Sequence, residues 1–269
     1  MTQYHFISGL PRSGTTLLSA ILQQNPMISS GIISPAATIL VAMQKAVSNS
    51  NEASAFLSKT QKLNQLRHCI TDCYDNNEEI VFDNNRGWSC KLPILSTLFP
   101  DSKIICCVRK LPWIIDSIEK LIRSNKTDLS GIFNFDPGKT VYERSQHLIS
   151  PNGLIGFAVN ALKEGYYSEY SDKLLLIEYD ALVKYPKEVI QQVYEWTNIP
   201  MYHKHDFNNV EQLPGIIEFD KNLGTPGLHS VGKTIKYQDR QTILPPDIFG
   251  SFTDPFWRLH KTKAKVITA

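Results

Sequence analysis

The sequence has no long apolar run and almost no net charge. None of its apolar stretches approaches the ~18 residues that a membrane-spanning helix needs, so we expect no transmembrane segment. The formal net charge of +2 is too small to indicate nucleic acid as a partner. The first residues lack a basic region, and Gly9, Pro11 and Arg12 interrupt their apolar run. We therefore also expect no signal peptide.

Cysteine is scarce, and no set of metal ligands is complete. The five cysteines are odd in number and form no Cys-x-x-Cys pair, so reduced thiols and a cytoplasmic location are expected. His203, His205 and Asp206 fall within one short segment, but a closed zinc site needs four ligands. We predict that the protein uses no metal.

One lysine is also missing, and its absence decides the chemistry of the N-terminal segment. Gly9 and Gly14 have the spacing of a Walker A phosphate loop, but Thr15 stands where the phosphate-binding lysine belongs. Arg12 lies inside the loop instead. A loop between a strand and a helix N-terminus binds anions, so this one suits a phosphate that carries a group other than a γ-phosphate. The alternative is a tight turn without a ligand.

Apolar runs and helical periodicity alternate along the chain. Strands are predicted at 4–8, 80–83, 103–109 and 174–178, and helices at 15–24, 35–49, 60–74, 88–99, 112–124, 152–170 and 185–197. The run from Ile104 to Val108 is apolar throughout, as a parallel strand covered on both faces should be. This order predicts an α/β fold with a mainly parallel sheet. From about residue 213 the chain is less regular and is expected to cover the sheet edge.

Two segments resemble the motifs of the sulfotransferases that use 3′-phosphoadenosine-5′-phosphosulfate (PAPS). SGLPRSGTTLLSAIL resembles their 5′-phosphosulfate loop, and ICCVRKLPWIIDSIEKL resembles their 3′-phosphate motif. The second likeness maps Arg109 and Ser117 onto ligands of the 3′-phosphate. Arg109 ends a parallel strand, where α/β folds bind ligands, and its guanidinium suits a phosphate.

Weaker likeness extends over most of the chain and is nearest to the bacterial and protein-tyrosine branches of the family. It implies a P-loop-type three-layer fold, with residues 1–269 forming a single sulfotransferase domain. It also implies PAPS as donor and adenosine 3′,5′-bisphosphate (PAP) as product. The predicted donor contacts are Pro11, Arg12, Ser13, Gly14, Thr15, Thr16, Arg109, Ser117, Tyr179, Ser230, Lys233 and Lys236. Tyr179 alternatively packs in the core, and the two lysines are alternatively solvated.

The predicted catalytic residues are Arg12, His229 and Asp83. By analogy with phosphoryl transfer, Arg12 is expected to stabilise charge on the sulfonate and on the bridging oxygen. The base is uncertain, because the family glutamate is absent and the triplet that starts at Asp83 lacks the family lysine. His229, in a glycine-bearing loop, is one candidate, with a structural role as the alternative. Asp83 is another, with helix capping as the alternative.

The sequence thus predicts transfer of a sulfuryl group from PAPS to a hydroxyl or amine. Short loops around an apolar, aromatic interior favour a small-molecule acceptor, and the protein-tyrosine likeness keeps a peptide open. Two other functions stay open: a P-loop kinase or NTPase, which Thr15 disfavours, and a nucleotide-binding protein that has lost catalysis. The sequence does not indicate the oligomeric state.

Overall fold

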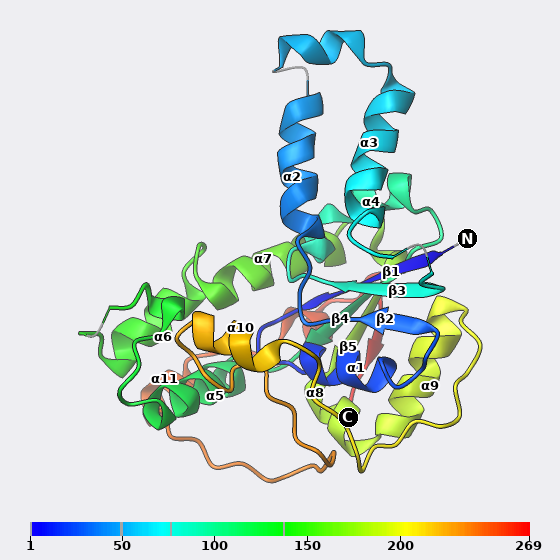
Figure 1. Cartoon of the computed structure of the whole chain (residues 1–269). Helices are drawn as coiled ribbons and strands as arrows, with labels where there is room; N and C mark the ends of the chain where they lie inside the picture. The colour runs from blue at the N-terminus through cyan, green and yellow to red at the C-terminus, as the bar shows by residue number, and fades with distance from the viewer. Residues whose placement is uncertain (1, 49–50, 76, 137) are drawn as a thin grey trace.

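The computed structural model describes residues 2–48, 51–75, 77–136 and 138–269. Its centre is a six-stranded sheet in the order β2-β3-β1-β4-β5-β6, in which every neighbouring pair is parallel (Figure 1). The strands are β1 (Gln3–Gly9), β2 (Ile28–Ser30), β3 (Ile80–Asn84), β4 (Ile104–Val108), β5 (Leu174–Glu178) and β6 (Lys265–Ile267). The predicted α/β fold with a parallel sheet is confirmed.

Side chains alternate between the two faces of the sheet and build one apolar cluster on each. In β4, Ile104 and Cys106 join one cluster, whereas Ile105 and Cys107 join the other. Residues from helices α2, α3, α4, α5 and α7 complete the first cluster, and residues from α1, α8 and α9 complete the second. Two helical layers therefore enclose the sheet, which explains why the central strands are apolar on both faces.

Most predicted helices are present with shifted ends. The helices outside the C-terminal region are α1 (Thr15–Leu22), α2 (Ala36–Val47), α3 (Lys59–Thr71), α4 (Leu92–Leu98), α5 (Leu111–Ser124), α6 (Val141–Ile149), α7 (Leu154–Tyr166), α8 (Tyr179–Lys184) and α9 (Pro186–Thr197). The helix predicted from Trp88 instead starts as a 3-10 turn, Trp88–Lys91, before α4. Asn49, the predicted end of α2, lies outside the described residues.

The C-terminal region is more regular than its Gly and Pro content predicts. It holds α10 (Ile216–Asn222), α11 (Pro246–Gly250), α12 (Phe256–Leu259) and strand β6. The last of these pairs with β5 and becomes the edge strand of the sheet. A three-residue strand that begins with a lysine has too few apolar positions to be recognised in the sequence.

Helices α2 and α3 project from the body of the molecule as an antiparallel pair (Figure 1). Neither they nor any other helix in the described part of the chain combines the length and apolar character required to cross a membrane. All five cysteines are free thiols.

Candidate active site

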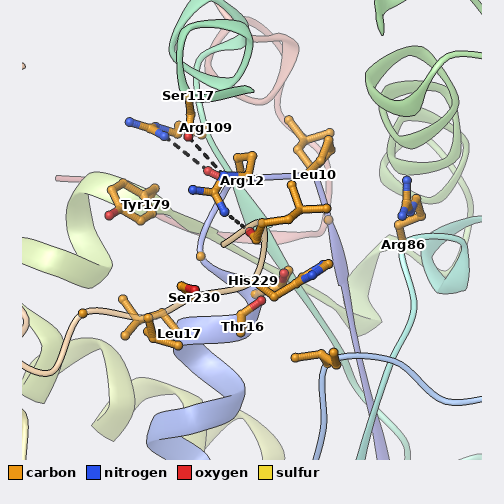
Figure 2. Close-up of a pocket in the computed structure, with 18 of the residues that line it drawn as sticks. Leu10, Arg12, Thr16, Leu17, Arg86, Arg109, Ser117, Tyr179, His229 and Ser230 are labelled. Atoms are coloured by element: carbon orange, nitrogen blue, oxygen red, sulfur yellow. Dashed lines mark hydrogen bonds between the residues drawn. The ribbon is translucent and has the colours of Figure 1, made fainter. Parts of the chain in front are cut away.

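A cavity of about 900 Å³ opens at the carboxyl edge of the sheet. Its walls come from the β1–α1 loop, the ends of β3 and β4, helix α5, and the segment 228–240 (Figure 2). Ligands bind at this edge in open α/β sheets. The cavity therefore lies where both sequence motifs were expected to act.

The β1–α1 loop is held in its course by glycine at two positions. Gly9 has φ +122°, and a Cβ there would lie 2.2 Å from the carbonyl oxygen of Cys107 on the neighbouring strand. Gly14, at the N-cap of α1, has φ +97°. L residues with a side chain rarely adopt such values, so both glycines of the motif meet backbone requirements.

Several residues of the loop that were predicted to contact the donor line the cavity, and one does not. Pro11, Thr15 and Thr16 line the cavity, at the positive end of α1. Ser13 does not: it is fully buried, and its hydroxyl donates to the carbonyl of Cys107 at 2.7 Å. The Ser13 side chain thus ties the loop to β4, and a contact of Ser13 with the donor stays a prediction.

Arg12 joins the two sequence motifs. Its Nε donates to Ser117 Oγ at 3.1 Å, and its Nη1 donates to the carbonyl of Leu228. Its own carbonyl accepts from Nη1 of Arg109 at 3.3 Å. Burial lowers the pKa of Arg12, although Tyr179 opposes this shift. The loop, α5 and the residue that follows β4 therefore meet at Arg12, through its guanidinium and its carbonyl (Figure 2).

Tyr179 packs against the apolar cluster that α1, α8 and α9 complete, and its ring also contacts two arginines. Its ring centroid lies 4.6 Å from Cζ of Arg109 and 4.8 Å from Cζ of Arg240. Arg240 also donates from Nη2 to the tyrosine hydroxyl at 3.0 Å. The sequence prediction missed Arg240. The sequence indicates it only as a basic residue in the segment 228–240, called here the covering segment. These contacts concentrate positive charge at one end of the cavity.

Of the residues predicted in the segment 228–240, one lysine lies outside the cavity wall. Ser230 and Lys236 line the cavity. Lys233 does not, because its side chain is exposed outside the cavity wall and only its carbonyl is engaged, by the amide of Val210 at 2.7 Å. The alternative of a solvated lysine thus describes Lys233.

His229 is held by a buried carboxylate that the sequence prediction missed. Nδ1 of His229 lies 2.5 Å from Oδ1 of Asp220, and its amide donates to Oδ2 of the same residue at 2.8 Å. Asp220, on α10, is 1% exposed, whereas His229 lines the cavity. A carboxylate on Nδ1 orients an imidazole so that Nε2 can accept a proton. No spacing rule in the sequence connects these two residues.

Asp83 is engaged elsewhere. It is 0% exposed, lies outside the cavity wall, and accepts from Tyr74 at 2.5 Å, from Nε1 of Trp88 at 2.6 Å and from Ser34. Burial raises its pKa. It caps no helix, since Gly87 occupies the N-cap of the following turn. The geometry supports neither predicted role, and Asp83 is left out of the proposed catalytic set.

Arg86, which the sequence prediction also missed, follows the triplet at the end of β3 and lines the cavity. No group of three His, Cys, Asp or Glu side chains in the described ranges has the arrangement of a metal site. His205 instead hydrogen-bonds to the hydroxyl of Tyr194 at 2.9 Å.

Residues 5–204 match the model of the sulfotransferase family. No curated protein sequence matches the chain. Among solved structures, the sulfotransferase domain from the curacin biosynthetic pathway is similar at 17% identity and TM-score 0.49, covering 80% of this chain and 81% of that one. A sulfotransferase from Alicyclobacillus acidocaldarius has 14% identity and TM-score 0.49, with 81% and 89% covered. A complex of retinol dehydratase with retinol and PAP has 11% identity and TM-score 0.47, with 87% and 73% covered.

The matched residues 5–204 include the phosphate loop, Arg109 and Ser117. They make up most of the chain, and the likeness seen in the two motifs thus extends over both halves of the sheet. The chain belongs to the family of PAPS-dependent sulfotransferases.

Proposed function

We propose that the protein transfers the sulfuryl group of PAPS to a hydroxyl or amine of a small molecule, with Arg12, His229 and Asp220 as its catalytic machinery. The observation that carries this proposal is the meeting of the phosphate loop, Arg109 and Ser117 around Arg12. A nucleotide with a phosphate at each end of its ribose needs two anion sites close together. The two motifs supply them, although some hundred positions separate them in the chain.

The residues present fit this donor. The α1 N-terminus, Thr15 and Thr16 offer hydrogen-bond donors and partial positive charge for the 5′-phosphosulfate. Arg109 and Ser117 would hold the 3′-phosphate, with Arg240 as a third group at the same end of the cavity. Bound PAPS would supply the sulfuryl group and a phosphate leaving group.

His229 is the proposed general base. In the proposed mechanism Nε2 accepts the proton of the acceptor hydroxyl or amine while the new bond to sulfur forms and the bond from sulfur to the phosphate oxygen breaks. Asp220 holds the Nδ1 hydrogen and stabilises the imidazolium that results. Arg12 stabilises the negative charge that develops on the departing oxygen. This pair offers a base where the family glutamate is missing, and it argues against a protein that has lost catalysis.

The shape of the cavity supports a small acceptor. Apolar side chains form much of its wall, including Ile32, Ile132, Leu154, Phe219 and Leu223. An acceptor with an apolar body suits such a surface.

The proposal is tested in two steps. PAP at about a hundred times its dissociation constant should stabilise the fold by about 2.7 kcal/mol and raise the melting temperature, whereas ATP should not. Protein incubated with sulfur-labelled PAPS and a library of hydroxyl and amine acceptors should then form labelled product. Stabilisation by ATP alone would favour a kinase or NTPase. Stabilisation by PAP without labelled product from any acceptor, peptides included, would indicate a nucleotide-binding protein without catalysis.

A further inference from the structure

Arg86 is a cation of the cavity that takes no part in the proposed binding of PAPS. It stands at the carboxyl end of β3, and Figure 2 shows it far from the side of the site that holds Arg109 and Tyr179. Its carbonyl accepts from the hydroxyl of Ser8 on β1 at 3.0 Å. The backbone position of Arg86 is therefore fixed to the neighbouring strand.

The turn that follows makes this position more rigid. The side chain of Asn85 accepts from the amide of Gly87 at 2.9 Å, and its carbonyl accepts from the amide of Trp88 at 3.1 Å. Trp88 is fully buried in the core. Because the backbone of this turn is already held in place, it loses little conformational freedom when a ligand binds to the Arg86 guanidinium. Such a position favours specific binding.

No anion balances the Arg86 guanidinium within the described part of the chain. Its side chain has no hydrogen bond or ion pair there, although it is accessible from the cavity. Two other cations in the same wall are engaged: Lys120 lies 2.7 Å from a carboxylate oxygen of Asp116, and Arg240 donates to the hydroxyl of Tyr179. Surrounding protein desolvates Arg86 and lowers its pKa without an opposing acid. Arg86 is nevertheless an exposed residue, so water reaches its charge in the free protein. An anionic ligand in the cavity would replace this water with a charge-assisted hydrogen bond.

Apolar side chains pack beside the residue that follows Arg86 or line the same cavity. The ring of Phe157 would lie 3.7 Å from a Cβ at Gly87, the residue after Arg86, and it is 44% exposed. Leu154, one turn earlier on α7, and Ile33, which is 46% exposed, line the cavity. A cavity that combines apolar walls with one unpaired charge matches a ligand that is itself apolar with one acidic group.

We propose that Arg86 binds an acidic group of the acceptor, so that the substrate is a small apolar molecule with a hydroxyl or amine at one end and an acidic group at the other. This inference rests on the proposed function, because it takes the arginine-rich end of the cavity as the place of the donor. The acidic group is a carboxylate, phosphate or sulfate, all of which a guanidinium binds through paired hydrogen bonds. The residue would act in specificity, and it would take no part in sulfuryl transfer.

The experiment compares acids with neutral molecules of the same shape. Binding of ω-hydroxyalkanoates and the matching α,ω-diols is measured by calorimetry on protein saturated with PAP. The acid should bind about tenfold to a hundredfold more tightly than the diol of equal length, which is the effect of one charged hydrogen bond. Monophosphate and monosulfate esters of the same diols distinguish the three acidic groups.

Variants locate the effect. Arg86→Gln should remove the preference for the acid and leave both PAP affinity and diol binding unchanged, and Arg86→Lys should keep part of the preference. Lys45→Gln removes a charge from the exposed face of α2 and should behave as the parent does. In activity assays with PAPS, Arg86→Gln should raise KM for acids and leave kcat for diols unchanged.

Other results would overturn the inference. If acid and diol bind with equal affinity while PAP binds normally, Arg86 does not bind an acidic group of the acceptor. If Arg86→Gln lowers turnover of neutral diols as much as that of acids, the arginine acts on the transferred group instead. If acidic peptides bind and hydroxyalkanoates do not, the acceptor is a peptide. Failure of PAP itself to bind would instead contradict the proposed function, which the same calorimetry detects first.

Discussion

Nε of Arg12 and Oγ of Ser117 lie 3.1 Å apart, although 105 positions separate the two residues. One belongs to the loop after the first strand and the other to the helix after β4. Arg12 is also in the left-handed region, with φ 55°, which costs a residue with a side chain about 1–2 kcal/mol. The fold maintains this conformation through the partners of the guanidinium, so the position of Arg12 depends on the whole site.

Replacing Arg12 with alanine should reduce turnover more than affinity. The guanidinium is expected to act on charge that develops during transfer, and loss of such a group lowers kcat by about 10²–10³-fold. PAP affinity should change less, because the loop amides and Arg109 remain. The measurement is steady-state sulfuryl transfer together with PAP calorimetry. Equal losses in both would reduce Arg12 to an anchor.

Replacing Arg109 with alanine should weaken nucleotide binding selectively. Loss of a charged hydrogen bond should cost about 1–3 kcal/mol of PAP binding energy. Adenosine 5′-monophosphate lacks the 3′-phosphate, so its affinity for the variant and the parent should be similar. Calorimetry with both ligands checks this, and an unchanged PAP affinity would remove Arg109 from the site.

His229→Gln and Asp220→Asn should each lower kcat and leave PAP affinity unchanged. Loss of general base catalysis costs about 10²–10⁴-fold, and an amide at position 220 would favour the wrong imidazole tautomer. Because the two residues act as a unit, the double variant should be little worse than His229→Gln. Losses that multiply in the double variant would show that the residues act separately.

The stability of the protein should fall between pH 6.5 and about 4 because of His5. This residue is fully buried, and burial lowers its pKa to about 4, with Lys103 adding to the effect. Below pH 6.5 the unfolded chain takes up a proton at this residue and the folded protein does not, so acid favours unfolding. The loss is about 3 kcal/mol over the window from 6.5 to about 4.

His5→Asn isolates this contribution. Nδ1 of His5 accepts from the amide of Lys103 at 3.2 Å, and an asparagine oxygen is a similar acceptor without titration. Urea unfolding at several pH values should show a shallower pH dependence for the variant than for the parent. Burial lowers the pKa of His205 as well, and that contribution should remain in both proteins. If the unfolding free energies of variant and parent depend on pH in the same way, His5 is not the cause of the loss of stability in acid.

Gly9→Ala should destabilise the fold by more than about 2 kcal/mol. A Cβ there would lie 2.2 Å from the carbonyl oxygen of Cys107, and the φ of +122° adds strain. Gly250→Ala is a matched control, because a Cβ at Gly250 would meet no atom within 4 Å. Chemical unfolding of both variants measures the difference. A small effect at Gly9 would mean that β1 and β4 separate easily at this edge.

The sequence determined the α/β fold and the backbone of the anion site. Uninterrupted apolar runs predict buried parallel strands, and β5 occurs within its predicted bounds. The two glycines of the loop have positive φ values, as the motif requires. These features are local: each depends on residues within one element and its adjoining turn.

Only the tertiary structure decided which side chains serve the cavity. It turned Ser13 toward β4, placed Asp83 in a buried hydrogen-bond network and left Lys233 outside. It also paired His229 with Asp220 and brought Arg240 against Tyr179. Such pairs depend on how distant segments pack over the sheet. Residue type and spacing in the sequence do not show which of these side chains meet. The role of a carboxylate or guanidinium depends on the partners that packing brings to it.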